Sequence, residues 1–417
     1  MTSRSRTGAP RARPTDGGTR RRRAPFLWLY LSLAWGTLLV LAATARPWLA
    51  VVVAALAGYS ILPIVVLVRS RGWKFYPGAA FRVLVVRGLL YVQLLLPFVA
   101  GAGLVGVLAG LVAGASALQW GRVAALAAFA IAALALLVGY VGSRMLRVRD
   151  VEVRIAGLAP ALDGLRIVQV SDLHVGPQVP RGFLGRVRAA IDRARPDVVA
   201  VTGDLVDDRA EDVARYADAL GGLERTAQVF VVAGNHDVYA GWADVERGLR
   251  ERALGTVLVN DAAVVRRDGA TLAIVGVGDP AGRARMWAKD DGSVVAPDVA
   301  RAMSRVPPGI PVIALAHNPA LWPELARAGA SLTLSGHTHW GQLAFPAARW
   351  SMATPFLEYS MGAYRENGAM LYIHPGTGYW GIPFRIGALP EVTVITLRAS
   401  SETSITLGPA RRPGSAL

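Results

Sequence analysis

The sequence predicts two parts, an all-α transmembrane region of four helices followed by a layered α/β domain. Three observations predict this division. Hydrophobic residues make up 53% of the 417 residues, and the mean hydropathy is +0.38. Long apolar runs are confined to the first 145 residues, whereas short apolar runs alternate with amphipathic stretches in the remainder. The charge changes at the same point, because 18 Lys and Arg stand against two acidic residues up to Asp150, and 27 of each sign follow it.

Charge and cysteine content exclude several classes of function. The whole basic excess lies in the first part, so the isoelectric point of about 10.9 describes a tail and the loops between apolar runs. The second part is balanced in charge, and we expect no nucleic-acid binding by it. The chain has no cysteine, which excludes disulfides, thiolate nucleophiles and cysteine-type zinc sites. Any metal must be held by His, Asp, Asn or Glu.

Four apolar runs are long enough to cross a bilayer, which takes roughly 20 residues. They contain no acidic residue, and they lack the polar face that a core helix of a soluble protein would carry. We expect a basic disordered tail at residues 1–24 and a transmembrane region at residues 25–145. The predicted spans are Phe26–Ala45, Pro47–Val68, Gly88–Val112 and Val123–Val141.

The distribution of basic residues predicts the orientation of these spans. Eight Arg precede the first span, five Lys or Arg lie between the second and third, and three Arg follow the fourth. The opposite loops hold only Arg46 and Arg122. Basic loops stay in the cytoplasm, so we expect a multi-pass protein of the cell membrane with both ends cytoplasmic. A count that differs by one span would place the second part on the opposite side.

A twin-arginine export signal is the alternative interpretation of the N-terminus. Arg20–Arg23 precede an apolar run, and Ala43–Ala45 resemble a small-residue cleavage site. Three further spans argue against export. Cleavage there would still leave the C-terminal part inside, because the remaining three spans begin outside.

After Asp150 the sequence predicts an α/β domain over residues 151–399 and a C-terminal tail at 400–417. Leu165–Val170 is typical of a buried strand, and five later apolar runs repeat the signal. The segment Arg181–Ala194 is typical of an amphipathic helix. Its apolar face consists of Phe183, Leu184, Val187 and Ile191.

Side chains that can bind a metal follow five of the predicted strands. Ligands of α/β sheets bind beyond the carboxyl ends of strands, so these turns can converge on one site. Singly, each turn is ordinary, and Asn-His-Asp is compatible with a helix cap. Five of the six histidines occupy these turns, and His374 stands apart. The turns contain Asp172 and His174, then Asp204, then Asn235, His236 and Asp237, then His317 and Asn318, and finally His337 and His339.

The order of these motifs, D-x-H, G-D, G-N-H-D, H and G-H-x-H, resembles the calcineurin-like metallophosphoesterase superfamily. The resemblance covers most of Val151–Leu397. The closing segment further resembles a bacterial membrane-linked branch, with its Gly-x-Gly, apolar-Pro-x-Arg and Pro-Glu features. Where that branch commonly has Ser-Arg before the glycines, this chain has His374 and Pro375, which leaves the role of His374 open.

The resemblance implies a four-layer α/β/β/α sandwich that holds two divalent metals, roughly 3.5–4 Å apart as in other two-metal sites. It implies that Asp172, His174 and His339 hold the first metal. It assigns Asn235, His317 and His337 to the second metal, with Asp204 bridging the two. Mn is favoured among the metals, and this donor set also suits Fe, Zn, Ni or Mg.

The expected reaction is attack of a metal-activated hydroxide on phosphorus. Two ions that share one hydroxide lower its pKa and hold the attacking and leaving oxygens. His236 would stabilise the phosphoryl oxygens or protonate the leaving group. Asp207 is our candidate for the carboxylate that orients His236, with Asp237 as the alternative. Trp340, Tyr379 and Trp380 are compatible with an apolar rim for substrate or with anchors at the membrane interface.

The short link between the last span and the domain predicts a substrate in the membrane. Barely twenty residues, Gly142–Leu162, separate the two. Tethering favours encounters with partners in the same plane, so we expect a lipid-linked phosphodiester or pyrophosphate as substrate. The alternatives are a phosphodiesterase on soluble nucleotides, a non-catalytic metal-binding scaffold and a regulator of transport. No intramembrane acidic residue supports the last of these.

Overall fold

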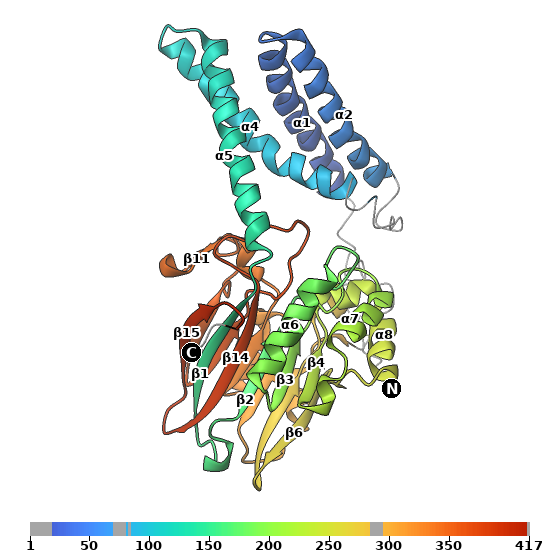
Figure 1. The fold of residues 1–417 in the computed structure, drawn as a ribbon, viewed down its shortest axis with the longest axis vertical. Helices are drawn as coiled ribbons and strands as arrows, with labels where there is room; N and C mark the ends of the chain where they lie inside the picture. Colours follow the sequence, from blue (N-terminus) through green and yellow to red (C-terminus); the bar gives the residue numbers. More distant parts are fainter. Residues whose placement is uncertain (1–18, 70–80, 82–84, 284–294, 415–417) are drawn as a thin grey trace, which may run out of the picture. The chain divides into compact units, whose positions relative to one another are not determined.

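The computed structural model describes residues 19–69, 81, 85–283 and 295–414. The chain forms two compact units, Met1–Leu134 and Ala135–Leu417, and their elements are labelled in Figure 1. We describe each unit separately. Of the predicted tail at residues 1–24, residues 1–18 lie outside the described residues. A helix begins at Thr19.

The first unit is helical, as the sequence predicts. Three of its helices contain stretches long and apolar enough to cross a membrane: Phe26–Ala43, Arg87–Val112 and Ala117–Gly142. In the remaining helix the described apolar part, Pro47–Ile61, is shorter. The span Pro47–Val68 therefore stays a prediction. The last helix begins six residues before the predicted Val123. The helix bounds are α1 Thr19–Ala43, α2 Pro47–Arg69, α4 Arg87–Val112 and α5 Ala117–Gly142.

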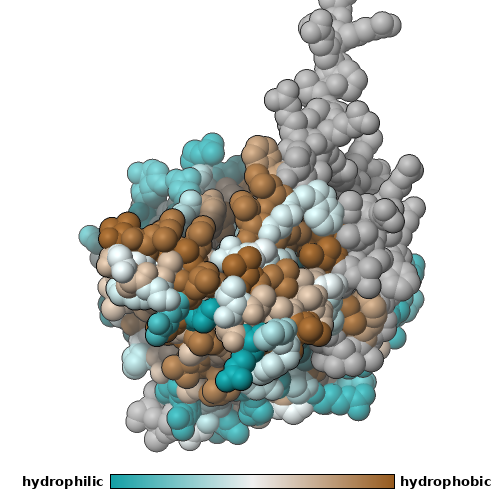
Figure 2. Space-filling model, turned by 90° about the horizontal axis from the view of Figure 1, so that it is seen from above, coloured by the Kyte–Doolittle hydropathy of each residue, from teal (hydrophilic) through white to brown (hydrophobic). Residues whose placement is uncertain are grey.

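Small residues bring α4 and α5 close together. A Cβ added at Gly106 would collide with the Trp120 carbonyl and with Ala124. Gly103 and Gly121 meet in the same way one turn further along. In lipid there is no hydrophobic driving force between apolar helices, so they associate through such close contacts. The outward side chains of the unit are hydrophobic, and Figure 2 shows hydrophobic surface interrupted by a few hydrophilic side chains on the face seen from above.

The second unit contains two main sheets. The seven-stranded sheet has the order β15-β1-β14-β2-β3-β4-β5 and the six-stranded sheet the order β12-β13-β9-β8-β7-β6. Strands β2 to β5 run parallel, as do β7, β8, β9 and β13. The strands of the first sheet are β1 Arg147–Ala156, β2 Arg166–Val170, β3 Val198–Thr202, β4 Gln228–Val232, β5 Thr256–Val257, β14 Glu391–Ser400 and β15 Ser404–Arg411. Those of the second are β6 Asp261–Arg267, β7 Ala270–Gly276, β8 Val312–Leu315, β9 Leu332–Ser335, β12 Gly362–Glu366 and β13 Ala369–Ile373.

The two sheets pack face to face, with helices on their outer faces. Val153 and Ile167 of the first sheet share a core with Leu272 and Ile313 of the second. Helices α6, α7 and α8 cover the outer face of the seven-stranded sheet, and α9 and α10 cover the other. Strands β3 and β8 are buried throughout because both of their faces are covered. The helix bounds are α6 Arg181–Ala194, α7 Val213–Leu220, α8 Asn235–Glu251, α9 Val299–Met303 and α10 Trp322–Arg327.

Short elements complete this unit. Strands β10, Ala344–Phe345, and β11, Trp350–Ser351, form a small separate hairpin. Turns of 3₁₀ helix lie at Pro160–Leu162, Ala210–Asp212, Leu223–Arg225, Pro280–Arg283, Pro319–Leu321, His339–Gln342 and Pro346–Ala348. Helix α6 has the bounds that the sequence predicts, and the four predicted apolar residues are buried.

The structure differs from the predicted domain boundaries at both ends. Residues 135–142 of α5 belong to the second unit, and β1 begins at Arg147 rather than after Asp150. Residues 404–411 are strand β15, which pairs with β1, rather than a tail. The Arg411 guanidinium holds the Asp150 carboxylate with 3.0 Å between Nε and Oδ2. The pattern of β15 contains Gly and Pro, which an edge strand tolerates, so the strand was not evident from the sequence.

Candidate metal centre

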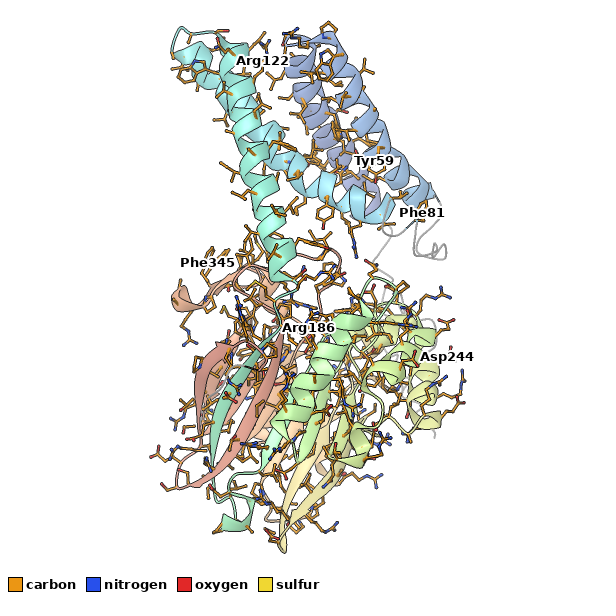
Figure 3. All side chains as sticks on the ribbon, viewed as in Figure 1. Tyr59, Phe81, Arg122, Arg186, Asp244 and Phe345 are labelled. Atoms are coloured by element: carbon orange, nitrogen blue, oxygen red, sulfur yellow. The ribbon has the colours of Figure 1, made fainter. Side chains whose placement is uncertain are left out.

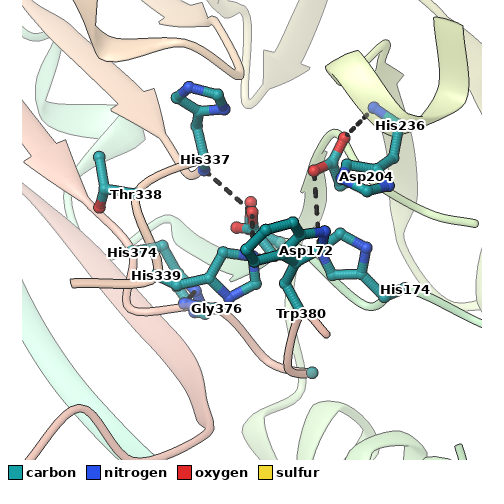
Figure 4. A network of polar contacts seen from close by, with 12 residues as sticks. Asp172, His174, Asp204, His236, His337, Thr338, His339, His374, Gly376 and Trp380 are labelled. Atoms are coloured by element: carbon teal, nitrogen blue, oxygen red, sulfur yellow. Dashed lines mark hydrogen bonds and ion pairs between the residues drawn. The ribbon is translucent and has the colours of Figure 1, made fainter. Parts of the chain in front are cut away.

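The five predicted turns meet at one place. Figure 4 shows residues of the turns after β2, β3, β4 and β9. The turns after β2, β3 and β4 come from the seven-stranded sheet, and those after β8 and β9 come from the six-stranded sheet. Most of the side chains they carry are buried, and His174 and Asp204 are each only 2% exposed. The structure brings together the seven residues proposed as ligands: Asp172, His174, Asp204, Asn235, His317, His337 and His339.

One half of the cluster consists of Asp172, His174 and His339. The Nε2 atoms of the two histidines are 3.0 Å apart, and Asp172 Oδ1 lies 3.3 Å from His339 Nε2. One donor atom of each residue lies within 4.8 Å of the other two. Three donors that converge from the turns after β2 and β9 can hold one ion, because metal bonds of about 2.0–2.2 Å bring neighbouring donors this close.

The other half consists of Asn235, His317 and His337. Asn235 Oδ1 lies 3.1 Å from His317 Nε2 and 2.8 Å from His337 Nδ1. Asp204 lies between the halves, since its Oδ2 is 3.3 Å from His317 Nε2 and 3.6 Å from His174 Nε2. One carboxylate therefore reaches both groups of donors.

The backbone of the cluster is held in an uncommon conformation. Five of the seven residues have positive φ, a region that side chains other than glycine rarely adopt and that costs about 1–3 kcal/mol each. Such strain concentrates at functional sites, where surrounding contacts enforce it. The φ angles are 53° at Asp172, 45° at His174, 52° at Asp204, 71° at His337 and 50° at His339.

Hydrogen bonds and one glycine fix the carboxylates. Asp204 Oδ1 accepts from the His236 amide at 2.8 Å, and Asp172 Oδ1 accepts from the His337 amide at 3.0 Å. A Cβ at Gly336 would collide with the Asp172 carboxylate, so only glycine fits there. Asp172 Oδ2 is buried and has no hydrogen-bond partner among the described residues. A buried carboxylate oxygen without a donor fits a divalent cation.

Comparison with known proteins finds a family that part of this domain resembles. Residues 165–341 match the family model described as calcineurin-like phosphoesterase. The match covers less than half of the chain. A zebrafish (Danio rerio) transmembrane protein with metallophosphoesterase domain is 35% identical over 263 residues, which are 60% of this chain and 57% of that protein. An uncharacterized metallophosphoesterase of Helicobacter pylori is 33% identical over 236 residues, or 56% of this chain and 60% of that one.

Other relatives differ in length and origin. The uncharacterized metallophosphoesterase YkuE of Bacillus subtilis is 27% identical over 268 residues, covering 63% of this chain and 89% of that one. This chain spans only about three fifths of the length of the zebrafish and Helicobacter proteins. Because vertebrate proteins match as well as bacterial ones, the similarity is not confined to a bacterial branch. Family and cluster together identify a metal-dependent phosphoesterase domain.

The charges of the metallophosphoesterase domain are arranged around Asp204. Burial opposes ionisation of Asp204, but the neighbouring His317 and His236 outweigh it and hold the pKa of Asp204 well below its usual range. Burial likewise opposes protonation of His317, but the carboxylate of Asp204 raises the pKa of His317 well above its usual value. Burial and the charge of His317 lower the pKa of His337 to about 4. The His337 ring is therefore uncharged at pH 7 and can bind a metal as it is, whereas the His317 ring must first lose a proton.

Loading chelator-stripped protein with Mn²⁺ is expected to release protons at pH 7. The raised pKa of His317 means that the ring is protonated before the metal binds, and ligands must be unprotonated. The apparent affinity should rise with pH, by up to about tenfold per unit for each proton displaced. Calorimetry in buffers of different ionisation enthalpy counts the protons. No proton release, with an affinity independent of pH between about 6 and 8, would contradict this charge arrangement.

His236 lies beside the cluster rather than in it. Its Nδ1 is 2.6 Å from the Asp207 carbonyl oxygen, so Nδ1 carries a proton and Nε2 is the ring atom left for a substrate. The ring packs edge-on against His174 with centroids 4.7 Å apart. The His236 side chain is 13% exposed, which places it at the mouth of the site.

The structure corrects the role predicted for the Asp207 carboxylate. Its Oδ1 lies 3.9 Å from His236 Nδ1 but 3.5 Å from His174 Nδ1. Asp207 thus orients His236 through its backbone carbonyl, and its carboxylate faces the ring of a proposed ligand. Asp237, the alternative, serves as a helix cap, because it accepts from the amides of Gly234 at 2.9 Å and Val206 at 3.1 Å.

Arg385 is the arginine of the apolar-Pro-x-Arg feature, to which the sequence assigned no role in the site. Its guanidinium is fully buried and donates to the carbonyls of His339 at 3.0 Å and Ala388 at 3.3 Å. It also binds the carbonyls of Pro375 and Gly378, and Nη2 lies 2.8 Å from His339 Nδ1. Burial and this positive charge hold the pKa of His339 well below its usual value, so the ring is neutral. Arg385 thus connects the His339 turn to the Pro375–Gly378 turn through hydrogen bonds to the carbonyls of both.

Arg385→Lys is expected to lower the Mn²⁺ affinity of the stripped protein by about tenfold, as loss of an outer partner of a metal ligand does. Lysine keeps the charge but cannot hold several carbonyls in a planar fork, so the effect isolates the position of His339. Titration calorimetry measures it, and thermal unfolding of the same sample shows that the variant is folded. An affinity equal to that of the wild type would show that Arg385 serves only the fold.

Of the remaining aromatic and histidine candidates, three are buried and one is exposed. Trp340 donates from Nε1 to the Ile373 carbonyl, Tyr379 donates to the Gln178 carbonyl, and both are buried. The predicted apolar rim therefore consists of Trp380, which is 55% exposed with its ring 6.3 Å from that of His236. His374 is buried outside the cluster and accepts from the Gly376 amide at 2.9 Å.

Proposed function

We propose that this chain is a membrane-anchored phosphohydrolase that uses two divalent metals to cleave a phosphodiester or pyrophosphate bond. The observation that carries the proposal is the position of Asp204, whose Oδ2 reaches donors of both halves of the cluster at 3.3 and 3.6 Å. A carboxylate in this position can bridge two ions. The described layering of two sheets and flanking helices supports a further proposal, that the domain is the four-layer α/β/β/α sandwich expected from the sequence.

The proposed ligands follow the two halves of the cluster. Asp172, His174 and His339 hold the first metal. Asn235, His317 and His337 hold the second, and Asp204 binds both. Imidazole nitrogens and carboxylate or amide oxygens suit borderline divalent ions, so we favour Mn, with Fe, Zn, Ni or Mg as alternatives. When bound, the pair supplies a hydroxide at neutral pH and compensates charge on the attacking and leaving oxygens.

The residues of the chain orient the substrate and move its proton. Proton transfer belongs to His236, because its Nδ1 is anchored at the Asp207 carbonyl and its Nε2 remains for the substrate oxygen. Asn235 fixes the second half of the cluster through two contacts of its Oδ1. Trp380 shields one side of the mouth beside His236 from water. Asn235, His236 and Asp207 are therefore the residues we propose for catalysis, with Asp207 acting through its carbonyl.

A lipid-linked substrate is supported by what lies next to the cluster. Only residues 143–146 separate α5 from β1, so the domain begins directly after a helix suited to a membrane. A cavity of about 500 Å³ opens at Val175 and Gly176, immediately after His174. Its lining combines apolar Val179 and Leu184 with Arg181, Arg188, Arg215 and Asp218, of which Arg188 also pairs with Asp192 and Arg215 with Asp212. Such a lining suits an amphiphile with a second anionic group. We propose a multi-pass topology with the domain in the cytoplasm, in a membrane-linked branch of the family.

A screen of membrane lipid extracts tests this substrate class. Extracts incubated with full-length protein and Mn²⁺ are compared with extracts incubated with Asp204→Asn, a near-isosteric change that removes the carboxylate proposed to bridge the metals. A phosphorylated lipid that disappears only with the wild type supports the proposal. If no lipid disappears while soluble nucleotide diesters are cleaved efficiently, the substrate is a soluble diester and the lipid proposal is wrong.

A further inference from the structure

An unusually apolar surface lies on the segment that follows the last proposed ligand. We define the apolar platform as Phe345, Trp350, Met352, Phe356 and Leu357. Phe356 is 80% exposed, Phe345 54% and Met352 46%. Within residues 343–358 the only charged side chains are Arg349 and Glu358. Folded proteins rarely expose several large apolar side chains together unless the surface binds something.

The platform is an ordered surface with a defined shape. Strands β10 and β11 form its hairpin, in which the rings of Phe345 and Trp350 stack with centroids 5.7 Å apart. The Met352 amide donates to the Leu343 carbonyl at 2.8 Å, and Thr354 Oγ1 accepts from the Ser351 amide at 2.9 Å. The backbone is thus bonded within the segment. Its apolar side chains point outward although their own hairpin could have buried them.

The platform is bonded to the end of α5. The Arg385 amide donates to the Gly139 carbonyl of α5 at 2.8 Å, and a Cβ at Gly139 would collide with the Phe384 ring. One residue further on, the Ile386 amide donates to the Gln342 carbonyl at 3.0 Å, and the Ala344 amide donates to the Ile386 carbonyl at 2.9 Å. Ala344 begins the hairpin of the platform. A short run of backbone bonds therefore connects a helix suited to a membrane with this surface.

The distribution of exposed apolar side chains agrees with this connection. Among the described residues of the second unit, large hydrophobic side chains are exposed on α5 from Leu137 to Val141, on the platform and at Trp380. Leu407 is the remaining exposed large hydrophobic side chain among the described residues of this unit. Exposed apolar surface is thus concentrated at the end of the domain that carries α5 (Figure 3, where Phe345 is labelled).

We propose that the apolar platform is a second membrane contact, which inserts into the interfacial region of the bilayer beside α5. Continuity with α5 favours lipid over a second copy of the chain. Exposed Phe and Leu beside a half-buried Trp and an arginine, here Trp350 and Arg349, are typical of segments that lie in the headgroup region. The inference does not depend on which phosphate ester the site cleaves.

Contact of the platform with lipid would place the mouth of the metal centre at the headgroups. Gln342, next to the hairpin, donates to the Trp380 carbonyl at 3.1 Å and accepts from the Trp380 amide at 3.0 Å. The Trp380 ring in turn lies beside that of His236. The platform, Trp380 and the proposed proton donor therefore form a continuous series of contacts.

Because the chain has no cysteine, single spin labels test this contact in the full-length protein. Labels are placed at Phe356→Cys and Phe345→Cys, with Asp244→Cys on α8 as the matched control. The Phe345 residue and the Asp244 side chain are similarly exposed, at 54% and 58%, and Figure 3 labels both. The protein is reconstituted into vesicles of phosphatidylcholine and phosphatidylglycerol, and collisions with oxygen and with a water-soluble nickel chelate are measured.

We expect the two platform labels to collide more often with oxygen and less often with the nickel chelate than the control label does. Their accessibilities should correspond to a depth of about 5–10 Å, while the control label stays accessible to the nickel chelate. Platform labels as accessible to nickel as the control would overturn the proposal. Spin–spin broadening that disappears on dilution with unlabelled protein would instead identify a second copy as the occupant, and would equally overturn it. No turnover is measured, so failure here is distinct from failure of the proposed reaction.

Discussion

Asp204→Asn is expected to lower turnover of a chromogenic phosphodiester by at least about three orders of magnitude, or more than about 4 kcal/mol of transition-state stabilisation. The change removes the carboxylate whose Oδ2 lies 3.3 Å from His317 Nε2 and 3.6 Å from His174 Nε2. An amide carries no charge and offers a single donor oxygen, so it cannot bridge two cations as a carboxylate does. In the proposed two-metal centre, the supply of hydroxide and the stabilisation of the leaving oxygen would depend on that carboxylate.

Metal content separates this effect from unfolding. Asp204→Asn should hold fewer than two Mn²⁺ per chain after dialysis, while its thermal unfolding without metal resembles that of the wild type. Asp212→Asn is the matched control, because Asp212 is also buried in this domain but pairs with Arg215 of α7, with 3.3 Å between Oδ1 and Nε. It should retain turnover and both metals. Wild-type turnover in Asp204→Asn would refute the bridging role.

His236→Ala is expected to lower kcat by about 10²–10⁴-fold, the range for loss of a positioned general acid or base. The ring is anchored through Nδ1 at the Asp207 carbonyl and does not belong to either group of proposed ligands. Its loss should therefore leave the content and affinity of the metals unchanged. The defect should lie in kcat rather than KM, because the proton moves in the transition state.

The leaving group distinguishes the two roles open to His236. If the imidazole protonates the leaving oxygen, the defect of His236→Ala shrinks for nitrophenyl esters, whose oxygen needs no proton, and persists for alkyl esters. If it stabilises the phosphoryl oxygens, the defect is the same for both. A variant that loses metal along with activity would show that His236 is a ligand, contrary to the arrangement proposed here.

The sequence predicted those parts of the structure that depend on local pattern. Helix α6 was predicted with its bounds because its apolar residues recur at helical spacing. The turns that carry Asp172, Asp204 and His337 were predicted because each follows a short apolar strand. The sequence could not show that these strands divide between two sheets, since β2 to β4 and β8 to β9 have the same apolar pattern.

The parts that were missed depend on contacts between distant segments. Arg385 lies 46 residues after His339, and its role appears only where two turns meet around its guanidinium. The Asp207 carboxylate was assigned to His236 by proximity in sequence, whereas folding brings it closer to His174. The platform was missed because its apolar run resembles that of a buried segment, and exposure is a property of the folded chain.

The most direct test of the account is the state of Mn²⁺ in the full-length protein. Two Mn²⁺ ions bridged by Asp204, roughly 3.5–4 Å apart, should give an exchange-coupled electron paramagnetic resonance spectrum at two equivalents per chain. Asp204→Asn should give the six-line spectrum of isolated Mn²⁺. A wild-type protein that binds one Mn²⁺, or two that show no coupling, would contradict a dinuclear centre.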